Sequence, residues 1–261
     1  MHDRARLRPG ILRRWTRHPR EPTFVLVHSP LVGPTSWLPV ARELGRRGRV
    51  AVVPSLLGVA EAPEPQWRHV PDAVQTATSE LRQRIVLVGH SGAGLLLPVI
   101  ANALAVEVTA LVFVDSLLPP PAGQLLLGRP EFMDQLHAMA TDGVLAPWSR
   151  WFGASAMREL VPDDRLRAHL EAEMPRLPLS YFEATVPVPD DWANARPCAY
   201  LLLSAPYAQS AAEALARGWP VIEIHGVQHL AIATDASPVT QALLDLERSL
   251  SNRPGSAAST D

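Results

Sequence analysis

Short, unbroken apolar runs recur along this chain, and each is followed by turn residues and a segment with helical spacing. A strand that is apolar at every position, not only at alternate ones, is covered on both faces, which is typical of parallel sheets. Alternation of such strands with helices predicts a doubly wound α/β fold, with a mostly parallel sheet and helices on both faces. The predicted strands are 23–28, 50–54, 85–89, 111–115, 198–203 and 220–225, and the predicted helices are 37–48, 71–83, 93–105, 209–217 and 239–250.

The interval between residues 116 and 197 interrupts this rhythm, because it has many prolines and no convincing strand. A structureless loop of that length is uncommon inside a compact domain. Helical patterns at 131–142, 155–160 and 165–174 favour a helical cap over the open end of the sheet. The chain then divides into a basic N-terminal extension (1–20), an α/β domain (21–250) with a cap insertion at about 117–192, and a flexible tail (251–261).

Composition excludes several classes of function. A formal net charge of −2 gives the chain no overall attraction for nucleic acid or an anionic membrane. Cys198 is the only cysteine, which excludes an intrachain disulfide and a cysteine-rich metal site. No stretch approaches the ~18 apolar residues of a membrane span, and the N-terminal segment lacks the apolar core of a secretory signal. We expect a cytoplasmic protein that needs no cofactor or metal and acts on a small molecule.

Residues 88–94, Val-Gly-His-Ser-Gly-Ala-Gly, carry the sharpest chemical signal. They join a predicted strand to a predicted helix, which is the context of a nucleophile elbow. A serine on so tight a turn is strained, and the residues two positions before and after it must be small, as Gly89 and Ala93 are. The turn also places Ser91 at a helix N-terminus, where backbone N–H groups favour developing negative charge. Ser91 is therefore the candidate nucleophile.

A serine hydroxyl is a weak nucleophile and requires a neighbouring base. Among the nine histidines, His229 lies in the loop between the last predicted strand and the last predicted helix. That loop is at the carboxyl edge of the sheet, the same edge as Ser91. His90 and His225 are interpreted as structural, so His229 is the candidate base.

These residues make the chain similar to the α/β-hydrolase superfamily, and within it to the small capped esterases and hydroxynitrile lyases. The likeness extends from about residue 23 to 250. Residues 27–29, Val-His-Ser, together with Trp37, resemble the first-strand motif of that group. Ser91 falls on the nucleophile of the superfamily and His229 on its histidine. The resemblance implies that an acidic residue completes a triad.

The position of that acid departs from the usual pattern. In most members the acid follows the fifth predicted strand, but here residues 204–209 contain no carboxylate. Asp190 and Asp191 precede that strand, at the opposite edge of the sheet, and Asp235 follows the candidate base. Asp115 ends the preceding strand, where some families of this fold, haloalkane dehalogenases among them, carry their acid. Asp115 is the candidate acid, and the alternative is a carboxylate that only caps its loop.

The oxyanion hole departs from the pattern as well. The backbone N–H of Gly92, directly after the nucleophile, is one expected donor. The resemblance places the second donor just after the first-strand motif, where this chain has Pro30, which has no N–H. Ser29 also replaces the glycine that is usual in that motif. The nearest replacements are the N–H of Leu31 and the hydroxyl of Ser29.

Three functions are compatible with this pattern. The first is a serine hydrolase of the esterase or thioesterase kind, acting on a small or medium apolar acyl compound, in which Ser91 attacks, His229 transfers the proton and Asp115 orients the imidazole. The second is a lyase, eliminase or cyclase that uses the same serine and histidine for proton transfer, and the missing oxyanion donor favours it. The third is a ligand-binding protein that keeps only the pocket.

Overall fold

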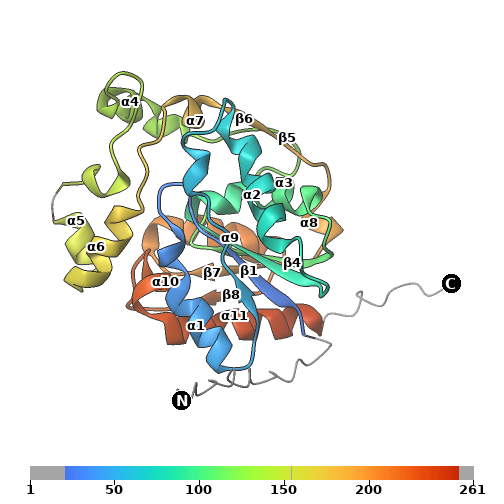
Figure 1. Cartoon of the computed structure of the whole chain (residues 1–261). Coiled ribbons are helices and arrows are strands. Elements are labelled where there is room, and N and C mark those ends of the chain that lie inside the picture. The colour runs from blue at the N-terminus through green and yellow to red at the C-terminus, as the bar shows by residue number, and fades with distance from the viewer. Residues whose placement is uncertain (1–20, 154, 253–261) are drawn as a thin grey trace, which may run out of the picture.

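A six-stranded parallel sheet forms the centre of this computed structural model, which describes residues 21–153 and 155–252 (Figure 1). Neighbouring strands of this sheet run parallel, as the unbroken apolar runs predict. The predicted extension (1–20) and residues 253–261 of the predicted tail (251–261) lie outside the described residues, whereas Ser251 is the last residue of a helix. In order across the sheet, the strands are β2 (Ala51–Val52), β1 (Thr23–Val27), β3 (Ile85–His90), β4 (Val108–Val114), β7 (Cys198–Leu202) and β8 (Val221–Glu223).

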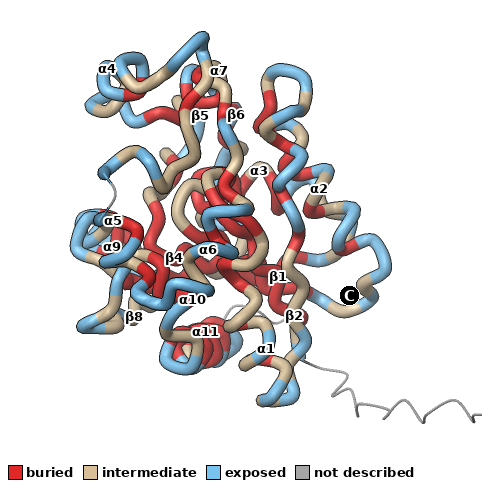
Figure 2. Tube along the Cα trace, turned by 60° about the vertical axis from the view of Figure 1, so that its left-hand side comes forward, coloured by how far each residue is buried: buried red, intermediate tan, exposed pale blue. Residues whose placement is uncertain are grey.

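Helices cover both faces of the sheet, because successive strand residues point to opposite sides. Val25 and Leu87 belong to one apolar core, which they share with residues of α2, α3 and α9. Phe24 and Val88 belong to the other core, together with residues of α1 and α11. Every residue of the central strands β1, β3, β4 and β7 is buried except Thr109 (Figure 2). These helices are α1 (Leu38–Arg46), α2 (His69–Thr78), α3 (Leu97–Ala103), α9 (Ala208–Ala216) and α11 (Ala236–Ser251).

One predicted helix of the α/β domain needs correction. Residues 93–105 do not form a single α-helix, because a 3₁₀ helix, η4 (Ser91–Leu96), precedes α3. Pro98 lies in the first turn of α3, where a missing N–H costs nothing, and the glycines before it are weak α-helix formers. The other predicted helices and strands of this domain overlap the observed ones, with different ends. Shorter elements are η1 (Pro34–Ser36), η2 (Leu57–Val59), η3 (Gln66–Arg68), η6 (Ala205–Tyr207) and α10 (Ala231–Thr234).

Residues 117–192, called here the inserted segment, contain the predicted helices and also two strands. The expectation of no strand in this interval is wrong, because β5 (Gly123–Leu126) and β6 (Thr185–Val188) form an antiparallel pair. Both strands are short and partly exposed, and a proline interrupts the second, so neither carries a strong strand pattern. The helices of the segment are α4 (Pro130–Met139), η5 (Trp148–Arg150), α5 (Ala156–Leu160), α6 (Asp164–Ala172) and α7 (Ser180–Glu183). A short helix, α8 (Trp192–Ala195), begins at the last residue of the segment.

The inserted segment packs on two loops at the carboxyl edge of the sheet. A buried apolar cluster joins Val161 and Leu170 of the segment to Val32, in the loop after β1, and to Leu230, in the loop after β8. Glu173, at the end of α6, accepts hydrogen bonds from the backbone N–H of Thr35 at 2.8 Å and from its hydroxyl at 2.6 Å. Helices α5 and α6 therefore lie beside α10 and against the loops that follow β1 and β8 (Figure 1). Among the described residues, the helices are too short or too polar to cross a membrane.

Candidate active site

Ser91 lies on the turn that joins β3 to η4, as the elbow motif predicts. Its backbone has a φ of 55°, a conformation that few residues other than glycine adopt. Strain of this kind persists only where the surroundings impose it, and it is concentrated at functional sites. The turn needs Gly89, because a Cβ atom there would lie 2.8 Å from the side chain of Leu97 and 3.1 Å from Cα of Gly94.

The structure brings Ser91, His229 and Asp115 into one chain of hydrogen bonds. His229 Nδ1 lies 2.7 Å from Asp115 Oδ2, and His229 Nε2 lies 3.1 Å from Ser91 Oγ. An ionised carboxylate can only accept a hydrogen bond, so Nδ1 carries the proton. Nε2 of a neutral imidazole is then free to accept the Ser91 hydroxyl proton. This is the geometry that activation of a serine requires.

Asp115 follows β4 and is completely buried. Its Oδ1 accepts the backbone N–H groups of Leu203 and Ser204, both at 2.9 Å, and its Oδ2 accepts the Ser204 hydroxyl as well as His229. Burial by itself raises the pKa of Asp115, but the hydrogen bonds from His229, Ser204 and Leu203 outweigh it and leave the pKa below its usual value. Asp115 also has a positive φ, of 45°, and its side chain extends to the end of the neighbouring strand β7.

Two buried histidines, His90 and His28, form hydrogen bonds with the backbone of the loops around Ser91, His229 and Asp115. His90 Nε2 donates to the backbone carbonyl of His229 at 3.0 Å, and the rings of these two residues have centroids 4.5 Å apart. His28 donates through Nδ1 to the carbonyl of Ser29 at 2.8 Å and accepts the N–H of Leu56 at 3.0 Å. Burial lowers the pKa of His28 to about 4 and that of His90 to about 3. Both rings are therefore neutral structural groups, which agrees with the interpretation of His90 from sequence.

The predicted oxyanion donors lie together. A Cβ atom on Gly92 would lie 3.4 Å from Ser29 Oγ and 3.7 Å from Pro30 Cδ, so Gly92 is in contact with the loop after β1. The Leu31 N–H donates to Ser29 Oγ at 3.3 Å, which means that the two predicted replacements are bonded to each other. Pro30, between them, offers no N–H.

Two aromatic side chains that the sequence reasoning left out of the site contact the candidate base. The ring of Tyr207 is stacked on that of His229, with centroids 5.1 Å apart and an angle of 10° between the planes. Trp148 of the inserted segment meets the same imidazole edge-on at 6.1 Å. The position of Tyr207 just after β7, at the carboxyl edge of the sheet, was the one signal that could have identified it.

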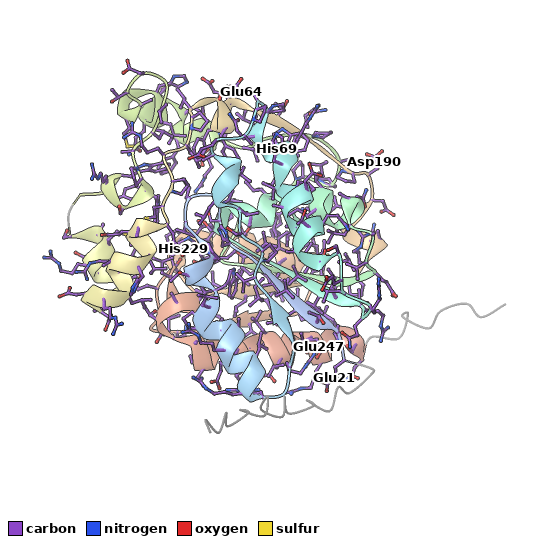
Figure 3. All side chains as sticks on the ribbon, in the orientation of Figure 1. Glu21, Glu64, His69, Asp190, His229 and Glu247 are labelled. Carbon is purple, nitrogen blue, oxygen red and sulfur yellow. The ribbon has the colours of Figure 1, made fainter. Side chains whose placement is uncertain are left out.

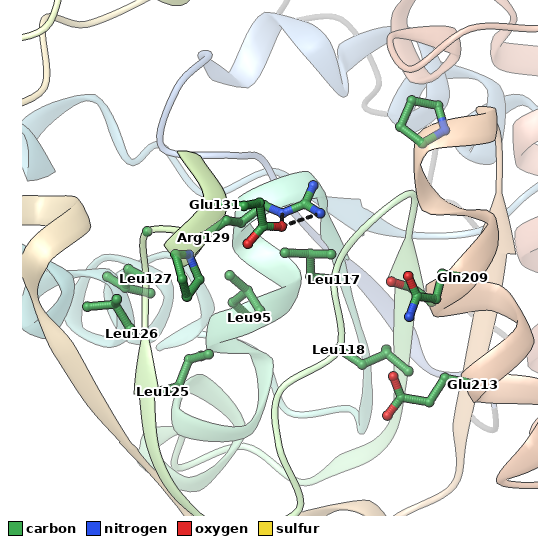
Figure 4. A pocket seen from close by; sticks show the side chains of 14 residues that line it. Leu95, Leu117, Leu118, Leu125, Leu126, Leu127, Arg129, Glu131, Gln209 and Glu213 are labelled. Atoms are coloured by element: carbon green, nitrogen blue, oxygen red, sulfur yellow. Dashed lines mark hydrogen bonds and ion pairs between the residues drawn. The ribbon is translucent and has the colours of Figure 1, made fainter. Parts of the chain in front are cut away.

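A pocket of about 280 Å³ lies between β5 and the segment formed by η6 and α9, and Ser91, His229 and Asp115 do not line it (Figure 4). Its wall includes Leu117, two residues after Asp115, and Pro206, directly before Tyr207. Polar groups come from Gln209, Glu213 and an ion pair of Arg129 with Glu131 at 2.8 Å. Six of the fourteen lining residues are leucine, namely Leu95, Leu117, Leu118, Leu125, Leu126 and Leu127.

Other candidate residues lie elsewhere. Asp190 is exposed and lies on the side of the molecule away from His229 (Figure 3). His225 is exposed and pairs with Glu223 at 3.2 Å. In the part of the chain that the structure describes, no group of three or more His, Cys, Asp and Glu side chains is arranged to hold a metal ion.

Known proteins match both the sequence and the fold. The model of the alpha/beta hydrolase family matches residues 24–242. A carbendazim hydrolyzing esterase from Nocardioides sp. (strain SG-4G) is 25% identical over 142 residues, which cover 48% of this chain and 59% of the esterase. The match thus spans about three fifths of the length of that relative.

Solved structures of two bacterial hydrolases share the fold. An extracellular alpha/beta-hydrolase from a Paenibacillus species superposes with a TM-score of 0.67 at 16% identity, covering 87% of this chain and 99% of the other. A pyrethroid hydrolase from Sphingobium faniae JZ-2 also gives a TM-score of 0.67 at 16% identity, covering 89% and 99%. Because the family model matches residues 24–242, which is most of this chain, the chain belongs to the alpha/beta hydrolase family.

Proposed function

We propose that the protein is a serine hydrolase of the esterase or thioesterase kind, with Ser91 as nucleophile, His229 as base and Asp115 as the acid that orients it. The observation that carries this proposal is the pair of contacts made by one imidazole, 3.1 Å to Ser91 Oγ and 2.7 Å to Asp115 Oδ2. Membership of the alpha/beta hydrolase family, and the similarity to a carbendazim hydrolyzing esterase, support the same reaction class.

In the proposed reaction, Ser91 Oγ attacks the acyl carbon while His229 Nε2 takes the hydroxyl proton. The electron pair of the carbonyl moves to its oxygen, and it returns when the bond to the leaving oxygen or sulfur breaks. His229 gives its proton to that leaving atom, and a water molecule then cleaves the acyl-enzyme by the same steps. Asp115 keeps the imidazole in one tautomer and stabilises the imidazolium. The carboxylate is itself held in place by the four hydrogen bonds that it accepts.

We infer that the pocket with the six leucines binds a small, apolar acyl or alkoxy group of the substrate. Its volume of about 280 Å³ is slightly below that of typical small-molecule sites, which measure about 300–1,000 Å³. The ion pair of Arg129 and Glu131 leaves no unpaired charge on that side of the pocket. The inserted segment covers the two loops beside Ser91, which is the role expected of a cap that excludes water.

A fluorophosphonate probe tests the nucleophile directly. We expect one label per wild-type molecule, at Ser91, and none on Ser91→Ala. Ser55→Ala, at an exposed serine, is the matched control and should label like wild type. Turnover of a panel of p-nitrophenyl esters and thioesters then identifies the preferred leaving atom. Labelling that persists in Ser91→Ala would show that another residue is the nucleophile.

A lyase, eliminase or cyclase remains the second candidate, because one observation favours it. Pro30 offers no N–H, and the N–H of Leu31 is directed to Ser29 Oγ, so the loop after β1 has no free backbone donor at either position. Tetrahedral intermediates of acyl transfer depend on such donors. Under this alternative Ser91→Ala still abolishes activity, but mass spectrometry of the working enzyme detects no acyl-enzyme at any substrate concentration.

A further inference from the structure

Tyr207 is linked through Ser204 to the carboxylate that holds His229. Its backbone N–H donates to the carbonyl of Ser204 at 3.1 Å. Ser204 in turn donates its N–H, at 2.9 Å, and its hydroxyl to Asp115. The tyrosine ring is only partly exposed and stacks on the imidazole with centroids 5.1 Å apart. Asp115 therefore fixes both the imidazole and the residue stacked on it.

The strand order places Tyr207 opposite the donor-poor loop. Ser91 follows β3, which lies between β1 and β4, and β7 is the next strand beyond β4. Ser29, Pro30 and Leu31 follow β1, whereas Tyr207 follows β7. Tyr207 and the loop after β1 therefore flank Ser91 from opposite sides.

The ring of Tyr207 is stacked on the imidazole whose Nε2 lies 3.1 Å from Ser91 Oγ, and its phenol stays protonated. Burial raises the pKa of Tyr207 above its ordinary value, and hydrogen bonding with Ser91 only partly opposes this effect. Protonated at neutral pH, the phenol is a hydrogen-bond donor that needs no further activation.

We propose that Tyr207 is a further catalytic residue of this site, whose hydroxyl donates a hydrogen bond to the reacting oxygen at Ser91. In the free enzyme that oxygen is Oγ, and after attack it is an oxygen of the bound substrate that gains negative charge. Tyr207 transfers no proton, because His229 carries it from Oγ to the leaving atom. The hydroxyl supplies electrostatic stabilisation that the Pro30 position does not. The inference rests on the proposed hydrolase reaction.

Tyr207→Phe separates the hydroxyl from the stacked ring. We expect kcat on a p-nitrophenyl ester to fall on the order of 10²-fold with KM within about twofold, which is typical of the loss of one donor to a charged oxygen. The pH at which the acid limb of the rate profile falls should not move, since the ring over His229 is retained. Tyr181→Phe, at a buried tyrosine of the inserted segment, is the matched control and should keep the wild-type kcat. A Tyr207→Phe enzyme with the wild-type kcat would overturn the proposal.

A measurement without substrate distinguishes this inference from the proposed function. In protein labelled with ¹³C at tyrosine Cζ, the Tyr207 resonance is the one missing from Tyr207→Phe. Ser91→Ala should shift that resonance and leave those of Tyr181 and Tyr200 in place. An unmoved resonance would overturn the contact with Ser91 whatever the enzyme hydrolyses. A shifted resonance in a protein inert to esters, thioesters and fluorophosphonates would overturn the hydrolase function, and with it the catalytic role of Tyr207, but not the contact.

Discussion

Asp115 and His229 are 114 residues apart in the chain, yet Asp115 Oδ2 and His229 Nδ1 lie 2.7 Å apart. The parallel sheet makes this possible, because it brings the ends of β4 and β8 to one edge on either side of β7. The carboxylate then spans the intervening strand end, where it accepts the N–H groups of Leu203 and Ser204. One buried aspartate thus orders two loops.

Asp115→Asn tests that relationship. The amide can still accept hydrogen bonds from the strand end, but its NH₂ group facing Nδ1 favours the wrong imidazole tautomer. We expect kcat to fall on the order of 10⁴-fold while the thermal unfolding transition stays cooperative. Asp190→Asn makes the same chemical change at an exposed site remote from His229 and should leave kcat unchanged. Equal activity of Asp115→Asn and wild type would exclude Asp115 as the acid.

Much of this arrangement could be predicted, because the patterns that indicate it lie within a few consecutive residues. The central strands are buried on both faces, so their apolar runs are unbroken, and the elbow needs its small residues within a few positions. Asp115 was found by elimination, because residues 204–209 carry no carboxylate. Ser204, in the region where the acid usually lies, instead donates to Asp115.

The remainder depends on contacts between distant segments. β5 and β6 are stabilised by each other across about sixty residues and by no pattern of their own. Nothing in the local sequence distinguishes Tyr207 and Trp148 from other aromatic residues, and only the fold brings both rings against one imidazole. Tertiary contacts determine whether such a side chain packs in a core or lines a site, and the periodicity of one sequence does not reveal these contacts.

The buried histidines predict how stability depends on pH. His28 and His90 have pKa values lowered from 6.5 to about 4 and about 3, so the unfolded chain binds protons that the folded chain does not. Their stabilising contribution is complete above pH 6.5 and is lost as the pH falls from there toward the folded values. Each adds a slope of up to about 1.4 kcal/mol per pH unit to the free energy of unfolding.

Urea unfolding at pH 7 and pH 5 measures this slope. We expect lower stability at pH 5, and a smaller difference between the two pH values for His90→Gln than for wild type. His225→Gln, at an exposed histidine, provides the control. A free energy of unfolding that is the same at both pH values would contradict neutral, buried rings at these positions.

Two glycine-to-alanine changes should have opposite effects on stability. A Cβ atom at Gly94 would lie 1.8 Å from Ser116 Oγ and 2.7 Å from its Cβ, so β4 and η4 would have to separate. We expect Gly94→Ala to lower the free energy of unfolding by about 1–3 kcal/mol. Gly45, in α1, has open space at its Cβ position, and alanine there should raise stability by about 0.5–1 kcal/mol. Urea unfolding measures both, and destabilisation by Gly45→Ala would contradict the packing described for α1.

The loop after β1 makes the strongest prediction about reaction type. Pro30 lies against Gly92 and has no N–H, and losing one oxyanion donor typically costs about 10²–10³ in rate. The wild-type protein should therefore be a slow general esterase unless another group, such as the Tyr207 hydroxyl, supplies the missing hydrogen bond.

Pro30→Ala restores a backbone N–H next to Gly92 without adding bulk. We expect kcat/KM on a p-nitrophenyl ester to rise about tenfold or more, while the natural reaction is unchanged or impaired. Pro34→Ala, at the start of η1 in the same loop, adds an N–H away from Gly92 and should have no such effect. A fast wild-type esterase that Pro30→Ala leaves unaltered would show that the hole is already complete. The lyase alternative would then lose its main support, because its argument depends on a donor missing at Pro30.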